Sequence, residues 1–167
     1  MRLMLKLQSR TMFRFSLIVT ACVSFALPIQ ANECDALVGN FLAHVPGLTF
    51  ASKSHMAAEF NFDIVYLKHP QATQVALSCG PLQPSLNIDW RGGLPSAGYF
   101  QLIGQLGSIM TGVSAEAVRA GAMECQRSAL VAKYEMSEFT SKGVKFECAI
   151  FTHDSGGTAM SIYQHKH

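Results

Sequence analysis

The chain has 167 residues, of which 49% are hydrophobic and 14% charged, and this length is sufficient for one domain with a buried core. Its net charge is +2, but four of the 13 basic residues lie before residue 15, and no acidic residue precedes Glu33. Without residues 1–31 the charge becomes −2, and no two lysines or arginines are adjacent. Such a surface lacks the basic patch that nucleic acid requires, so we expect no nucleic-acid partner.

The first 31 residues have the order of a secretory signal of bacterial type: basic residues, an apolar run over 15–29, and a small residue suited to cleavage, Ala31. The run is shorter than the roughly 20 residues of a membrane-spanning helix. Met12 is an alternative start that gives a signal of ordinary length. Attachment of a lipid at Cys22 is disfavoured because the apolar run continues beyond it. We therefore expect a cleaved signal at 1–31, one domain over 32–167, no membrane span, and a periplasmic or secreted location.

The first half of the exported region predicts one helix followed by four strands. Apolar residues recur at steps of three and four over residues 32–45, which is typical of an amphipathic helix. Alternating apolar and polar residues predict strands at residues 48–53, 60–68, 73–79 and 86–90. In the second of these strands, four apolar side chains share one face: Phe60, Phe62, Ile64 and Tyr66.

The second half predicts two helices, over residues 97–111 and 114–131, and then three strands, at 134–139, 144–151 and 158–163. The run Asp154-Ser155-Gly156-Gly157 between the last two strands resembles the segment around the nucleophilic serine of chymotrypsin-like proteases. Only 12 residues follow Ser155, however, and a protease of that class needs long segments there. Four turn-forming residues between two alternating segments instead predict a hairpin turn.

This order of elements predicts an α+β fold with antiparallel β-meanders and about three helices packed on one face. A weak repetition accompanies it. Phe62-Asp63 and Phe146-Glu147 stand at the same distance before His69 and His153, and each histidine begins a predicted turn. An internal α-β-β-β duplication explains this pattern, and so does chance, because all meanders alternate.

Four cysteines remain after removal of the signal, and an even number in an exported chain predicts disulfides. An up-and-down chain path brings Cys34 to Cys79, while Cys125 and Cys148 lie on inward faces of their elements. We therefore predict the pairs Cys34–Cys79 and Cys125–Cys148. No pair has Cys-x-x-Cys spacing, which excludes that type of redox site.

One candidate binding site is the loop that contains the only tryptophan. It places Asp89, Trp90 and Arg91 side by side, and exposed tryptophan and arginine are frequent anchors in interfaces. The alternative is that Trp90 packs in the core while its two charged neighbours are solvated.

The second candidate site consists of histidines. His69 and His153 begin corresponding turns, Asp154 adds a carboxylate, and the C-terminal His165 and His167 are further possible ligands for zinc or copper. No two histidines have the i, i+4 spacing of a helical metal site. The sequence therefore predicts neither a metal nor a cofactor.

We expect from these observations a non-enzymatic binding or interaction module whose partner is a small ligand or a periplasmic or extracellular protein. Two alternatives stay open. One is a small hydrolase or metal-dependent enzyme that uses His69, His153 and Asp154. The other is an inhibitor or immunity-type partner of a secreted enzyme, for which an exposed Trp90-Arg91 loop is the expected anchor.

Overall fold

The computed structural model describes residues 29–56, 62–80, 83–152 and 156–164. Along the chain these ranges contain α1 (Ile29–His44), β1 (Thr49–Met56), β2 (Phe62–His69), β3 (Ala72–Cys79), β4 (Ser85–Arg91), α2 (Ala97–Thr111), α3 (Ala115–Val131), β5 (Met136–Ser141), β6 (Val144–Phe151) and β7 (Gly157–Gln164). The apolar run of the expected signal, the alternative start at Met12 and the lipid-attachment candidate Cys22 lie outside the described residues. Within the described ranges, no helix has both the length and the apolar character needed to cross a membrane.

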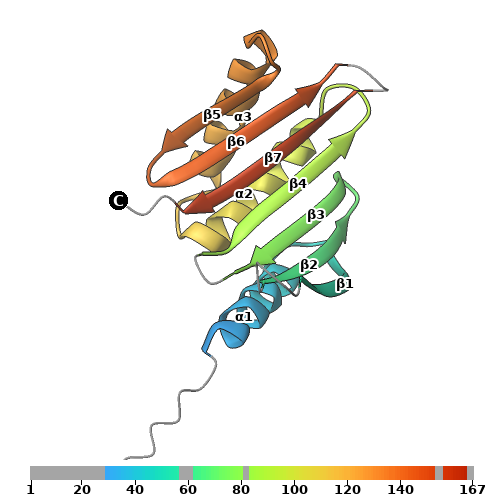
Figure 1. Cartoon of the computed structure of the whole chain (residues 1–167), viewed down its shortest axis with the longest axis vertical. Helices are drawn as coiled ribbons and strands as arrows, with labels where there is room; N and C mark the ends of the chain where they lie inside the picture. The colour runs from blue at the N-terminus through green and yellow to red at the C-terminus, as the bar shows by residue number, and fades with distance from the viewer. Residues whose placement is uncertain (1–28, 57–61, 81–82, 153–155, 165–167) are drawn as a thin grey trace, which may run out of the picture.

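All seven strands form one antiparallel sheet in the order β1-β2-β3-β4-β7-β6-β5 (Figure 1). Two three-stranded meanders are joined through β4, because β4 pairs with β3 on one side and with β7 on the other. The α+β class, the helices on one face and both disulfides are confirmed. Several boundaries differ by two or three residues; the predicted strands at 48–53 and 134–139 are β1 at Thr49–Met56 and β5 at Met136–Ser141. The helix α1 begins at Ile29, inside the expected signal, so cleavage after Ala31 stays a prediction.

The helices cover only one face of the sheet (Figure 1), and the core lies between the two layers. Side chains alternate along the strands, and β2, β3, β4, β6 and β7 bury the residues of their inward face against the helices, whereas the edge strands β1 and β5 contribute no fully buried residue. The buried strand residues include Val65, Leu67, Val75, Leu77, Leu86, Ile88, Phe146, Met160 and Ile162. The opposite face of the sheet has no covering layer among the described residues.

The apolar set predicted for the second strand lies on that uncovered face. Phe62, Ile64 and Tyr66 do share a face, but Val65 and Leu67 are the residues that β2 contributes to the core. Phe60 lies outside the described residues. Both faces of β2 are apolar in sequence, so alternation alone could not show which face the helices cover.

Glycines allow close packing between α3 and the sheet and between α2 and α3. A Cβ atom added to Gly121 of α3 would lie 2.6 Å from the ring of Phe146 on β6. A Cβ added to Gly107 of α2 would lie 2.6 Å from Val118 of α3. These glycines therefore set the spacing between α2, α3 and the sheet.

The structure contains two helix-plus-meander units, α1-β1-β2-β3 and α3-β5-β6-β7, as the duplication hypothesis requires. The sequence repetition, however, does not preserve the faces. Asp63 points to the helix side and Phe62 away from it, whereas Phe146 points to the helix side and Glu147 away from it. Duplication thus stays a hypothesis that the side-chain directions do not support.

Candidate functional site

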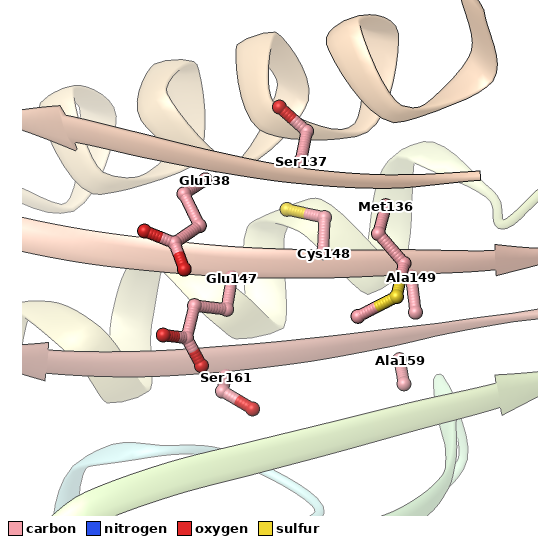
Figure 2. Close-up of a pocket in the computed structure, with 8 residues that line it drawn as sticks. All are labelled: Met136, Ser137, Glu138, Glu147, Cys148, Ala149, Ala159 and Ser161. Atoms are coloured by element: carbon pink, nitrogen blue, oxygen red, sulfur yellow. The ribbon is translucent and has the colours of Figure 1, made fainter. Parts of the chain in front are cut away.

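The uncovered face of the sheet is hollowed where β5, β6, β7 and β4 lie side by side. Ala149 of β6 faces Ala159 of β7 directly across the strand pair, and their small side chains leave space above the sheet. One hollow of about 380 Å³ is lined mainly by Met136, Glu138, Glu147, Ala149, Ala159 and Ser161 (Figure 2). A second, of about 450 Å³, is lined mainly by Asp89, Arg91, Glu135, Phe151, Gly157 and Ala159.

Ala159 lines both hollows, so we describe them together as the cross-strand groove. The floor consists of alanine and glycine on β6 and β7, and larger side chains stand at both ends. Each hollow has a volume in the range of small-ligand sites, about 300–1,000 Å³. The groove is therefore large enough to hold a small molecule or a few residues of a polypeptide.

One end of the groove carries two carboxylates from neighbouring strands, Glu138 of β5 and Glu147 of β6 (Figure 2). The Lys145 ammonium lies 3.0 Å from Glu138 Oε2 and 2.9 Å from Glu147 Oε1. Hydrogen bonds from the Tyr163 hydroxyl and from Lys145 hold the pKa of Glu147 below its usual value. The lowered pKa keeps Glu147 charged, and this end of the groove sets one ammonium between two acidic side chains.

The other end carries Asp89, which is half-buried on β4. The described residues form neither a hydrogen bond nor a salt bridge to its carboxylate. Burial raises the pKa of Asp89, and the charge of Arg91, two residues along the same strand, lowers it by a smaller amount. Burial therefore disfavours the charged form of Asp89, and Arg91 offsets only part of that effect. Asp89 is thus the least satisfied charged group that we find in the groove.

The structure separates the three residues of the predicted tryptophan site. Asp89 and Arg91 point to the groove, whereas Trp90 points to the helix side, where it packs against the core. Its indole Nε1 donates a hydrogen bond to the Gly93 carbonyl at 3.1 Å. Strand β4 therefore presents the acid and the base on the uncovered face, with the tryptophan on the helix side.

The histidine site is only partly described. His69 has both ring nitrogens engaged: Nε2 donates to the Pro46 carbonyl and Nδ1 accepts from the Gln71 amide, each at 3.1 Å. His153, Asp154, Ser155, His165 and His167 lie outside the described residues. The flanking strands β6 and β7 do pair as the predicted hairpin, and Gly156 has a φ of 77°, a conformation that favours glycine. Among the described residues, no three histidine, cysteine or acidic side chains gather as a metal site would require.

Sequence reasoning nominated Asp89 and Arg91 but missed the rest of the groove. A signal was present, since four neighbouring outward positions of β6 and β7 are small or polar: Glu147, Ala149, Ala159 and Ser161. It could be interpreted only with the pairing of β4 and β7, which joins segments about 70 residues apart.

No protein-family model, curated protein or solved structure matches the chain. The fold and the groove are therefore the basis on which we classify this protein. It is an α+β protein with two disulfides, a helix layer on one face of a seven-stranded sheet, and a groove on the other face.

Proposed function

We propose that this protein is an exported, non-enzymatic binding module that holds its partner in the cross-strand groove. The observation that carries the proposal is the hollow on the uncovered sheet face, where Ala149 and Ala159 form a small-residue floor between charged ends. An antiparallel sheet with one solvated face normally fills that face with side chains in mutual contact. A floor of alanines between larger residues instead provides room for another molecule.

A periplasmic or secreted location is part of the same proposal. The two disulfides, Cys34–Cys79 and Cys125–Cys148, fit an oxidising compartment. The basic and apolar order of residues 1–31 provides a route to that compartment. The partner is therefore expected to be a molecule of the periplasm or of the extracellular medium.

The experiment that tests the proposal fills the groove without changing its charge. Ala159→Leu places a branched side chain on the floor, and Ala120→Leu makes the same change at an exposed position of α3, behind the sheet. The protein purified after export is immobilised with each variant and exposed to the periplasmic or culture fluid of its host. Melting curves of both variants verify that they are folded.

We expect the native protein and Ala120→Leu to retain the same partner, and Ala159→Leu to lose it. Equal capture by all three proteins would show that the partner binds elsewhere. That result would refute the groove as the binding site.

A further inference from the structure

We propose that the cross-strand groove binds the lysine or arginine side chains of a polypeptide partner, and that Asp89 receives the charged group of one of them. This inference rests on the proposed function and names the chemistry of the partner. It is carried by the charge of the groove lining, by the lack of a partner for Asp89, and by the exposed apolar side chains beside it.

The groove lining is acidic. Among the described residues that line it, four are carboxylic acids and one, Arg91, is basic, while the Lys145 ammonium contacts two of the acids at one end. The acids are Asp89, Glu135, Glu138 and Glu147. A concave surface with an excess of charges of one sign concentrates ligands of the opposite sign. The groove therefore selects a cation over an anion or a neutral molecule.

Among these four acids, Asp89 is the one whose carboxylate receives no hydrogen bond from the described residues. Lys145 already pairs with Glu138 and Glu147, and Thr152 donates through both its amide and its hydroxyl to the carboxylate of Glu135. No such donor reaches the carboxylate of Asp89 from the described residues. An ammonium or guanidinium group would supply charge-assisted hydrogen bonds to an acid whose charged form is disfavoured by burial.

The apolar residues of the groove suit an organic cation with a long aliphatic stem. Phe151 is 53% exposed beside the hollow that contains Asp89, and Met136 is 66% exposed beside the other hollow. Lysine and arginine pack their stems along such side chains while their charged groups reach a polar site. The exposed ring of Phe151 also offers a cation–π contact.

Two observations favour a polypeptide over a free amine. Tyr134, which adjoins the groove-lining Glu135 in the chain, is 76% exposed. Exposed apolar residues beside a binding groove are typical of protein interfaces. The groove also crosses four neighbouring strands, a span of about 14 Å, which corresponds to roughly four residues of extended chain.

The test uses a defined probe, the peptide acetyl-Val-Arg-Val-Lys-Val-amide, because alternate residues of an extended chain point to the same side. A matched peptide replaces arginine by citrulline and lysine by norleucine, which removes both charges and keeps the shape. Spermidine is the free-amine probe. Binding to the exported protein is measured by calorimetry, and the contact site by changes in amide NMR signals.

We expect the basic peptide to shift the signals of Asp89, Ala149 and Ala159, and the uncharged peptide and spermidine to bind at least tenfold more weakly. Asp89→Asn should weaken the basic peptide about tenfold or more, since a hydrogen bond between charged groups is lost. Glu116→Gln, an equal change of charge on the opposite side of the sheet, should change the affinity less than twofold.

The inference is overturned if Asp89→Asn binds as tightly as the native protein, or if the uncharged peptide or spermidine binds equally well. Its failure can be told apart from failure of the proposed function. Capture of a natural partner that is lost in Ala159→Leu but kept in Asp89→Asn would leave the groove as the binding site and reject only the cationic ligand.

Discussion

Loss of the two disulfides should leave this protein close to unfolding, and the size of the effect follows from the loops that they close. Cys34–Cys79 closes a loop of 45 residues and Cys125–Cys148 a loop of 23. In the chain-entropy model the longer loop contributes about 4.0 kcal/mol at 25 °C and the shorter about 3.4 kcal/mol. The loops do not overlap along the chain, so their contributions add to about 7 kcal/mol.

That amount is comparable to the whole stability of a domain of this size, which is about 5–15 kcal/mol. The assay is urea unfolding followed by circular dichroism, with and without a thiol reductant. Two variants separate the crosslinks, each with both cysteines of one pair replaced by alanine. Reduction of the variant that keeps Cys34–Cys79 should cost about 0.6 kcal/mol more than reduction of the variant that keeps Cys125–Cys148.

A reduced protein that stays within about 2 kcal/mol of the oxidised one would refute this reasoning. It would show that the crosslinks are dispensable for folding, and the argument from disulfides to an oxidising compartment would lose its basis. A large loss would mean that folding depends on an oxidising environment.

Three further predictions concern stability. Gly121→Val should lower the free energy of unfolding by about 1–3 kcal/mol in urea titrations, because its side chain collides with the ring of Phe146; an unchanged midpoint would contradict the close packing of α3. Asp89→Asn should raise the melting temperature at pH 7, because burial raises the folded-state pKa of this acid and so disfavours its charged form. The gain should shrink as the pH falls through that pKa towards 3.8. A lower melting temperature at pH 7 would show that the Asp89 carboxylate makes a stabilising contact. Asp63→Asn should do the opposite, because hydrogen bonds from His55 and a lysine lower the pKa of Asp63. Its contribution is present above pH 3.8 and is lost as the pH falls through the lowered pKa, so scanning calorimetry should show a larger deficit at pH 7 than at pH 3; an equal deficit at both would contradict the pairing.

The parts of the fold that could be predicted from sequence are those set by local periodicity. The stripe of apolar residues in α3 and the alternation in β6 placed Cys125 and Cys148 on inward faces, and their disulfide followed from that placement. The pairing of β4 with β7 could not be predicted, because neither segment contains a sequence feature that identifies the strand it pairs with.

The candidate site was predictable in part for the same reason. Asp89 and Arg91 were predicted as site residues because they adjoin Trp90, yet in the structure Trp90 packs against the core. What makes Asp89 notable is its neighbour across the strands, Ala159, whose small side chain leaves the acid beside a hollow. The contact between Asp89 and Ala159 depends on the register between two strands that are distant in sequence, and amino-acid composition does not reveal that register.

The central claim is that a partner occupies the uncovered face of the sheet, and site-specific photo-crosslinking in the native host tests it most directly. A diazirine-bearing amino acid is introduced in place of Met136, which is 66% exposed beside the groove, or in place of Met123, which is 43% exposed on α3 behind the sheet. The account predicts a covalent adduct with one polypeptide after illumination at position 136 and none at position 123. An adduct at position 123 alone, or at neither position, would contradict it.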